Sequence, residues 1–303
     1  KVLANASLSF EPIKGLVLKV YGGIENSDDR NDYYRTLNFF NQQSNASVTT
    51  TQFTSLLNEN TITYSRNIGA KHKILALGGF TYQDFVNTSL SGSGTGFLSD
   101  ATESYNLTAA TIPGIPGSGY SKSVLLSYLG RINYNFNDRF LATVSFRSDG
   151  SSKYSEGNKW GFFPSAAVAW RLKEEAFLAK NDFISDLKLR ASWGRTGSQA
   201  IGAYATLNQL AVGKTVFGDA LYNTFAPTTT LPGNLKWETT QTFNVGIDYS
   251  FFNGRINGNI EMYVANTKDL LMKRTVPIMN GYKTIWDNVG KTRNKGVEFT
   301  LNT

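Results

Sequence analysis

The chain of 303 residues contains no cysteine and only one histidine, His72. The lack of cysteine excludes disulfide frameworks and thiolate metal sites. One histidine among scattered carboxylates offers little material for a zinc or iron centre, and only one candidate base for a nucleophilic triad. His72 stands between Lys71 and Lys73 with no carboxylate or second histidine nearby in sequence, so we interpret it as a turn residue. We therefore expect no catalytic residue, no metal site and no cofactor, and a protein that is not an enzyme.

Long hydrophobic runs are also missing, although 41% of the residues are hydrophobic. No stretch approaches the roughly 18 consecutive apolar residues that a membrane-spanning helix requires. The mean hydropathy is -0.27, which excludes a helical membrane protein. The first residues hold one basic side chain and no apolar core, so they do not match a signal peptide and are interpreted as the inside of a strand.

Runs of basic residues are absent, although the formal net charge is +7. The lysines and arginines are scattered, and they pair only at Lys273-Arg274. A nucleic-acid-binding protein would gather such residues in a patch or stripe. We therefore expect no nucleic-acid partner and assign these charges to a solvated loop or pore surface.

Strict alternation of apolar and polar residues recurs along the chain. Between residues 243 and 251 the apolar side chains occupy the odd positions, and small or polar side chains occupy the even ones. Asn253-Gly254 follows, a dipeptide that favours a tight hairpin because both residues accept positive φ. Asn137-Asp138 joins two further alternating segments in the same way. The pattern predicts about eleven strands, at residues 2–10, 15–23, 61–69, 72–84, 124–136, 139–149, 162–172, 187–196, 243–251, 255–264 and 289–302.

The predicted connections alternate between short and long, as the short periplasmic turns and long external loops of outer-membrane barrels do. Short ones fall near 11–14, 67–71, 137–138 and 252–254, and long ones at 24–60, 87–122, 147–161, 197–235 and 267–288. A longer turn at 173–186 departs from this rule, and we expect a short helix in it around Glu174–Lys180. Aromatic residues prefer the membrane interface, and they gather beside the short turns: Tyr134, Phe136, Phe140, Trp170, Tyr249, Phe251 and Phe252.

These features favour a transmembrane antiparallel β-barrel, although a soluble β-sandwich also has one apolar and one polar face. The sandwich would make the chain a soluble or surface adhesin that binds without transport, and it stays the alternative. An outer-membrane enzyme in a small barrel would need a histidine or paired acids near the rim, which the sequence does not supply. Single-chain bacterial barrels have even strand numbers, so eleven strands, with the last one unfinished at Thr303, predict a fragment.

Several motifs in the second half of the chain carry a family signature. They are Arg147-Ser-Asp-Gly-Ser-Ser-Lys-Tyr154, Lys159-Trp-Gly-Phe-Phe-Pro-Ser165, Val168-Ala-Trp-Arg171, Leu187-Lys-Leu-Arg-Ala-Ser-Trp-Gly-Arg-Thr-Gly-Ser-Gln199, Leu235-Lys-Trp-Glu-Thr-Thr-Gln241 and Asn288-Val-Gly-Lys-Thr-Arg-Asn-Lys-Gly-Val-Glu-Phe299. In this order and spacing they resemble the SusC/RagA family of TonB-linked outer-membrane proteins. The resemblance covers residues 123–303, and residues 1–122 carry no comparable signature.

The resemblance implies an all-β, 22-stranded barrel in the bacterial outer membrane, with an N-terminal plug in its lumen. Residues 1–303 would then be part of a single barrel domain, and the plug and closing strands would be absent from this chain. The implied activity is TonB-dependent import of oligosaccharides or peptides. The implied partners are a SusD-like surface lipoprotein as a lid, TonB acting through the missing plug, and membrane lipid or lipopolysaccharide, with importer and lid pairs often forming dimers.

Aromatic residues in the long loops are the candidate substrate-binding residues, because sugar faces stack on aromatic rings. Loop packing or contact with the lid would explain the same residues. The candidates are Tyr33, Tyr34, Tyr154, Trp160, Tyr282 and Trp286. Asp149 could hold a sugar or a cation, but Asp149-Gly150 is interpreted as the start of an external loop. The glycine-rich run at 92–96 is interpreted as a flexible loop, because no helix pattern follows it.

Overall fold

The computed structural model describes residues 1–38, 40 and 42–303, which form an all-β chain. Eleven strands follow one another in one sheet in the order β1-β2-β3-β4-β6-β7-β8-β9-β13-β14-β17, and β5 (Ala110–Pro113) pairs with β4. The predicted fold class and the set of about eleven barrel strands are thereby confirmed. The strands are β1 (Val2–Ile13), β2 (Leu16–Arg35), β3 (Asn45–Ile68), β4 (His72–Phe97), β6 (Gly117–Phe136), β7 (Phe140–Ser151), β8 (Trp160–Arg171), β9 (Ile184–Ser198), β13 (Glu238–Phe251), β14 (Ile256–Lys268) and β17 (Lys291–Asn302).

Smaller elements lie in the connections. Strands β10 (Leu210–Phe217) and β11 (Ala220–Pro227) form an antiparallel hairpin. Strands β12 (Thr230–Leu231), β15 (Leu271–Thr275) and β16 (Thr284–Asn288) form a small sheet in the order β12-β16-β15. The predicted long connections 197–235 and 267–288 therefore contain sheets of their own. The 3-10 helices are η1 (Glu103–Tyr105), η2 (Leu107–Ala109), η3 (Leu172–Glu174) and η4 (Ile278–Asn280).

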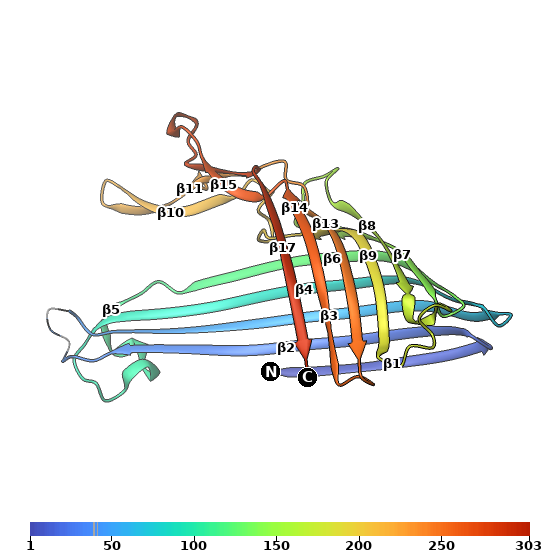
Figure 1. Ribbon diagram of the computed structural model, residues 1–303. Coiled ribbons are helices and arrows are strands. Elements are labelled where there is room, and N and C mark those ends of the chain that lie inside the picture. Colours follow the sequence, from blue (N-terminus) through green and yellow to red (C-terminus); the bar gives the residue numbers. More distant parts are fainter. Residues whose placement is uncertain (39, 41) are drawn as a thin grey trace. The chain divides into compact units, whose positions relative to one another are not determined.

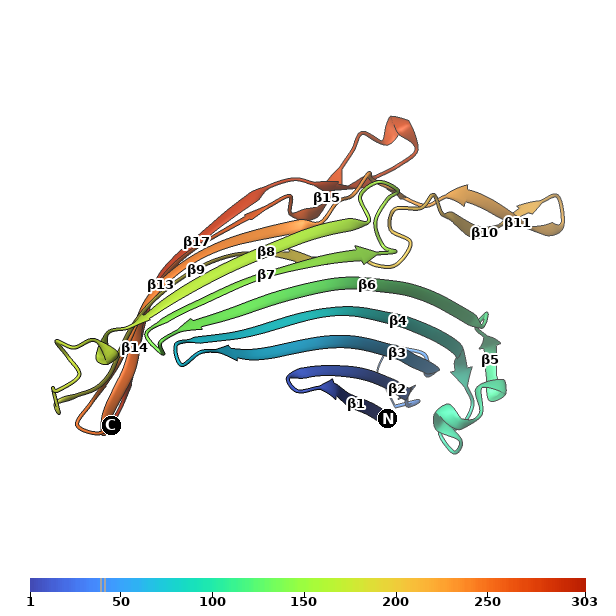
Figure 2. The same ribbon diagram turned by 90° about the vertical axis from the view of Figure 1, so that its right-hand side faces the viewer.

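The chain divides into two compact units. Unit 1 contains Lys1–Leu8, Tyr21–Asn58 and Tyr82–Val124. Unit 2 contains Ser9–Val20, Glu59–Thr81 and Leu125–Thr303. Within unit 2, strands β7, β8, β9, β13, β14 and β17 lie side by side, each hydrogen-bonded to the next (Figures 1 and 2).

The register of unit 2 keeps apolar side chains on one face of the sheet. Val245 of β13 lies opposite Ala191 of β9 and Met262 of β14, and Met262 in turn lies opposite Val297 of β17. Successive side chains of a strand point to opposite faces, so the odd positions of β13 belong to an apolar face that crosses these strands. This face is open, because Phe243 is 52% exposed and Met262 is 59% exposed. A sandwich would cover it with a second sheet, so the sandwich alternative is not favoured.

The residues of the tight turns adopt positive φ angles. Asn137 and Asp138 both have a φ of 54°, in the left-handed region. At the second turn Phe252 and Asn253 have φ values of 53° and 56°, and Gly254 has a φ of 86°. Hairpin turns of this hand match the twist of the flanking strands. Both predicted hairpins are confirmed, and in the second the left-handed residues begin one position earlier than Asn253-Gly254.

Two predicted long loops, 24–60 and 87–122, are wrong, because extensions of β2 and β3 fill most of the first, and extensions of β4 and β6 together with β5 fill most of the second. The extensions carry small and polar side chains on both faces, as in the run Ser47-Val-Thr-Thr-Thr-Gln52, so the hydrophobic alternation that reveals a strand is missing. Threonine and other β-branched residues nevertheless suit an extended backbone. Residues 39 and 41, inside the first predicted loop, lie outside the described residues.

The helix predicted around Glu174–Lys180 is wrong in extent. The structure has the 3-10 helix η3, which ends at Glu174, and turns follow it. The ammonium group of Lys173 binds three backbone carbonyl groups of the segment that follows. It donates at 3.3, 3.4 and 2.7 Å to the carbonyl oxygens of Leu178, Ala179 and Asn181. These carbonyl groups thus accept hydrogen bonds from a side chain in place of the backbone hydrogen bonds of a helix.

Candidate functional site

An aromatic row borders the apolar face of unit 2 at its tight turns. Phe140 stacks on Phe136 and on Trp170, with ring centroids 6.5 and 5.9 Å apart. His72 begins β4, and its Nδ1 lies 2.7 Å from the hydroxyl oxygen of Tyr134. The aromatic residues predicted to gather at the short turns do come together. The contact of His72 with this row agrees with its interpretation as a turn residue.

A second aromatic group lies on the same face toward the opposite end of the strands. Trp160 stacks on Tyr128 at 5.9 Å, and Phe162 stacks on Phe146 at 6.3 Å. Trp160 lies opposite Gly150, whose missing side chain leaves room for the indole, since an added Cβ would lie 2.9 Å from the ring. Paired aromatic rows at the two ends of an apolar band are typical of a membrane-spanning sheet.

The polar face of unit 2 carries an ion network over three neighbouring strands. The Nε of Arg190 on β9 donates to Oδ1 of Asp248 on β13 at 3.0 Å, and its Nη2 donates to Glu261 on β14. The Nζ of Lys188 lies 2.7 Å from Oδ2 of Asp248. The amide of Asn244 donates to Oε2 of Glu261 at 3.0 Å. Each carboxylate is therefore held by two donors.

Gly246 lets Arg190 reach across β13. It lies opposite Arg190 on one side and opposite Glu261 on the other. A Cβ at this position would lie 3.0 Å from Cζ of Arg190, so the guanidinium group lies over the glycine. Sequence patterns alone did not reveal this network, although a signal is present: Lys188, Arg190 and Asp248 occupy even positions of β9 and β13, which is the face opposite to Val245.

Removal of Arg190 tests the network. We expect Arg190→Ala to lower the free energy of unfolding by about 1–3 kcal/mol, because Asp248 and Glu261 would both lose a charged donor. The side chains are partly exposed, which keeps the effect below that of a fully buried pair. Lys188→Ala is the matched control and should cost below about 1 kcal/mol, because Arg190 still holds Asp248. Denaturant midpoints of the intact receptor measure both, and an equal or larger loss for Lys188→Ala would contradict this account.

Asp149 does not start an external loop, because β7 continues to Ser151. Its carboxylate is buried and lies 2.7 Å from Nε of Arg147, which also donates through Nη2 to Ser127 Oγ at 2.9 Å. The predicted loop start is therefore wrong. The Asp149 carboxylate, which could have held a sugar or a cation, is instead paired with Arg147 of the same strand.

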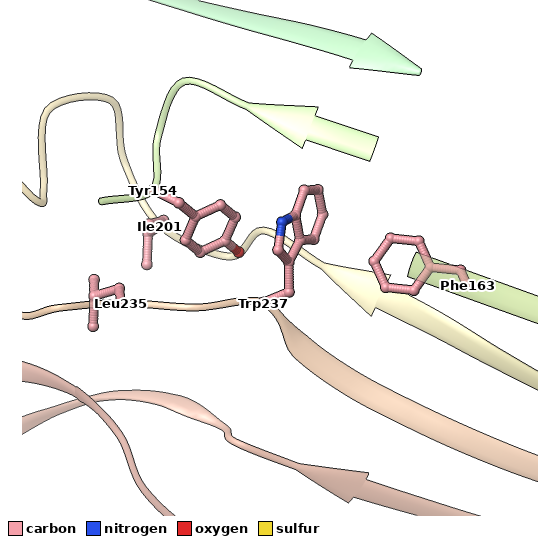
Figure 3. Packing of buried hydrophobic residues seen from close by; sticks show 5 residues of the cluster. All are labelled: Tyr154, Phe163, Ile201, Leu235 and Trp237. Atoms are coloured by element: carbon pink, nitrogen blue, oxygen red, sulfur yellow. The ribbon is translucent and has the colours of Figure 1, made fainter. Parts of the chain in front are cut away.

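The buried hydrophobic residues of unit 2 form a loop core beside the N-terminal ends of β8 and β13 (Figure 3). The indole of Trp237 lies 4.9 Å from the ring of Tyr154 and 5.4 Å from that of Phe163, measured between centroids. Its Nε1 donates to the carbonyl of Lys159 at 3.0 Å, and the Tyr154 hydroxyl donates to the carbonyl of Ser198 at 2.9 Å. Burial raises the pKa of the Tyr154 hydroxyl. The loop core consists of Tyr154, Phe163, Ile201, Leu235 and Trp237.

For three of the six candidate substrate-binding residues, packing or position in a strand explains why an aromatic side chain is present. Tyr154 is 1% exposed, so neither of its ring faces can receive a sugar, and that assignment is corrected. Trp160 is 51% exposed but lies in β8, on the apolar face of the sheet and not in a loop. Trp286 is half-buried, packs against the loop core, and has Nζ of Lys273 5.2 Å from its ring centroid.

The other three candidates belong to different units of the chain. Tyr282 is half-buried in unit 2, between η4 and β16. Tyr33 and Tyr34 are in unit 1 near the end of β2, and Tyr33 is 51% exposed. Substrate binding by these three residues stays a prediction.

Tyr34 closes a loop contact within unit 1. Its hydroxyl donates to Oδ1 of Asp100 at 2.6 Å, and the same oxygen accepts the backbone N–H of Leu37 at 3.1 Å. The ring packs edge-on against Phe97 at 5.6 Å. Tyr34 stands far beyond the roughly ten residues with which a strand crosses a membrane. The hydrogen bond to Asp100 raises the pKa of Tyr34 to about 12.

This pKa predicts a loss of the contact at high pH. The folded state holds the phenolic proton more tightly than the unfolded chain, where the pKa is near 10. The stabilisation is therefore complete below about pH 10 and is lost as the pH rises toward 12. The difference in tyrosinate absorbance between the wild type and Tyr34→Phe should titrate near pH 12. Tyr33→Phe is the control, and a Tyr34 midpoint near 10 would contradict the contact.

The described residues contain no group of three or more histidine, aspartate or glutamate side chains that could hold a metal ion. Over the same residues, no helix has the length and apolar character needed to cross a membrane.

One open apolar face bordered by aromatic rows, backed by one charged face, defines the wall of a transmembrane β-barrel. Comparison with known families agrees with this class. The chain belongs to the family described as TonB dependent receptor-like, beta-barrel, whose model matches residues 3–303. Proteins of this family reside in the outer membrane, and the predicted recognition and localisation are thereby confirmed.

Individual relatives agree with the family. The chain is 38% identical over 266 residues to TonB-dependent receptor P26 of Formosa agariphila, covering 88% of this chain and 27% of that protein. It is 43% identical over 190 residues to TonB-dependent receptor SusC of Bacteroides thetaiotaomicron, covering 60% of this chain and 19% of that protein. A solved structure of the RagAB peptide transporter superposes with a TM-score of 0.87 at 27% identity, covering 99% of this chain and 33% of that one. The chain thus spans about a third or less of the length of these relatives.

Proposed function

We propose that the protein containing this chain imports oligosaccharides or peptides across the bacterial outer membrane as a TonB-dependent transporter, and that it catalyses no covalent reaction. The two-faced sheet carries this proposal, because its apolar side suits lipid and its charged side suits an enclosed polar conduit. The likeness to the RagAB peptide transporter supports it, at an identity of 27% over nearly the whole chain.

The remaining length of such a receptor supplies the parts that this chain does not show. We propose that it holds a plug in the lumen, the segment that TonB contacts, and the strands that close the barrel. The relatives named after SusC and RagAB support a SusD-like lipoprotein as a lid on the external side. Dimers of importer and lid pairs belong to the same proposal.

Three of the predicted aromatic residues remain proposed substrate platforms. Tyr33 is exposed, while Tyr282 and Trp286 are half-buried, so each presents ring surface outside the barrel strands of unit 2. Rings of this kind stack on sugar faces and pack on peptide side chains. Tyr33→Ala and Trp286→Ala are expected to weaken substrate binding, whereas Trp160→Ala, on the apolar face, should not.

Uptake by living cells tests the import proposal. Isotope-labelled starch oligosaccharides and a labelled tryptic digest of serum albumin would be offered to the wild type, to a strain lacking the receptor, and to one lacking TonB. We expect at least one probe to enter the wild type, to be excluded from both mutants, and to enter again when the receptor gene is restored. Uptake that is equal in all strains, or that persists without TonB, would contradict the proposal.

A further inference from the structure

Five basic residues gather on the apolar face of unit 2, at the end of β9, β14 and β17 away from the tight turns. We call Arg195, Lys268, Lys291, Arg293 and Lys295 the basic patch. Lys268 lies opposite Lys291, Asn266 lies opposite Arg293, and Val264 lies opposite Lys295. Arg195 lies opposite Gln241, which itself lies opposite Asn266. These register positions share the face of Phe243 and Met262, because they are separated from them by even numbers of residues.

Strand β17 shows how the patch adjoins the apolar band. On this face its side chains are Lys291, Arg293 and Lys295, followed by Val297, Phe299 and Leu301. The three apolar residues are largely exposed. One side of a single strand thus changes from cationic to apolar, and β14 changes in the same direction from Lys268 to Met262. The face is shaped for a ligand with an anionic head and apolar chains.

The basic patch has no acidic partner among the described residues. None of its members takes part in an ion pair there, although the nearby Lys236 is paired with Asp269 at 3.1 Å. Lys268 and Lys291 stand directly opposite each other, and like charges in that position are destabilising. The Nε of Arg195 is buried and lacks a hydrogen-bond partner. On the polar face, by contrast, Arg190 is neutralised by carboxylates. Within the part of the chain that the structure describes, no carboxylate neutralises the basic patch, so its charge suits an external anion.

The position of the basic patch along the membrane normal indicates where that anion lies. A strand rises by roughly 3.3 Å per residue and is tilted by roughly 40° in a barrel. Along β14 the chain climbs about 20 Å from Ile256 to Val264, and about 30 Å from Ile256 to Lys268. The apolar band of an outer-membrane barrel is about 25 Å tall. The patch therefore brackets the outer boundary of the hydrocarbon layer, where lipid phosphates lie.

We infer that the basic patch binds the phosphate groups of a phosphorylated outer-leaflet lipid whose acyl chains lie against Val297, Phe299 and Leu301. Arginine donates two parallel hydrogen bonds to phosphate, and lysine adds compact positive charge. A single phosphate between Lys268 and Lys291 removes their mutual repulsion. The inference rests on the outer-membrane position of the sheet, but not on what the receptor transports.

Lipid binding by the intact receptor in nanodiscs tests the site. The variant combines Lys291→Gln, Arg293→Gln and Lys295→Gln. Its matched control combines Lys14→Gln, Lys71→Gln and Lys180→Gln, which remove three exposed charges at the opposite, short-turn end. The probes are native lipopolysaccharide, the same lipid after enzymatic removal of its phosphates, and inorganic phosphate. Heat-shifted gel mobility shows that each variant has folded, and uptake of the probes described above is measured in parallel.

We expect the wild type and the control to bind native lipopolysaccharide at least about tenfold more tightly than its dephosphorylated form, and the patch variant to lose this difference. Millimolar inorganic phosphate should not displace the lipid, because it lacks the acyl chains. Equal lipid binding by the patch variant and the wild type would overturn the inference. Loss of a co-purifying protein with unchanged lipid binding would also overturn it and make the patch a protein interface. A wild type that binds lipid by phosphate but imports nothing would refute the transport proposal alone.

Discussion

Replacing Trp237 by alanine is expected to destabilise the loop core by about 3–5 kcal/mol, the cost of deleting a buried indole. Trp237 is 7% exposed, contacts the rings of Tyr154 and Phe163, and donates to the carbonyl of Lys159. Its removal leaves a cavity and takes away one of the two donors of that carbonyl, which also accepts the backbone N–H of Ser151 at 3.0 Å. The segments 152–159 and 199–207 should then lose protection in hydrogen–deuterium exchange of the intact receptor.

Trp160→Ala serves as the matched control for that experiment. This indole is close in sequence to the loop core but lies on the other face of the sheet, against Tyr128. Its removal should leave exchange in segments 152–159 and 199–207 unchanged. Equal effects of the two tryptophan variants on these segments would contradict the proposal that Trp237 holds the loop core together.

Replacing Val245 by arginine is expected to lower the free energy of unfolding in a bilayer by about 2–4 kcal/mol, the cost of a charge on the lipid side near the mid-plane. Val245 lies about halfway along the apolar face of β13, opposite Ala191 and Met262. Asn244→Arg places the same charge one residue away on the polar face, where water and carboxylates receive it. Denaturant midpoints of the receptor in lipid vesicles compare the two, and equal losses would argue against a lipid-facing side.

The sequence predicts the parts of the fold in which one face is apolar. Residues 243–251 and 255–264 alternate strictly, and the residues 137–138 and 253–254 mark the turns, so strands, hairpins and register follow from local patterns. The extensions of β2, β3 and β4 were missed because their faces are both polar. There the strand is held by the ladder of backbone hydrogen bonds, which leaves no mark on the hydrophobic pattern.

The candidate site was harder to predict because the aromatic residues of the loops contact residues that are far away in the sequence. Tyr154 packs on Trp237, and Tyr34 reaches Asp100, contacts that no local pattern specifies. Trp160 was assigned to a loop because strand β8 begins two residues earlier than predicted. The charged groups, by contrast, obey the period of two. Arg190 and Asp248 fall on one face and Arg293 and Lys295 on the other, so counting charges separately for odd and even positions would have revealed both groups.

Label accessibility along β13 tests the central claim, that one side of this sheet meets lipid and the other meets a polar lumen. Single cysteines at positions 243 to 248, in an intact receptor with any other cysteine replaced, would carry nitroxide labels. We expect labels at 243, 245 and 247 to be relaxed mainly by oxygen dissolved in lipid, and those at 244, 246 and 248 mainly by a water-soluble nickel chelate. Equal access of the nickel chelate to all six positions would contradict the central claim.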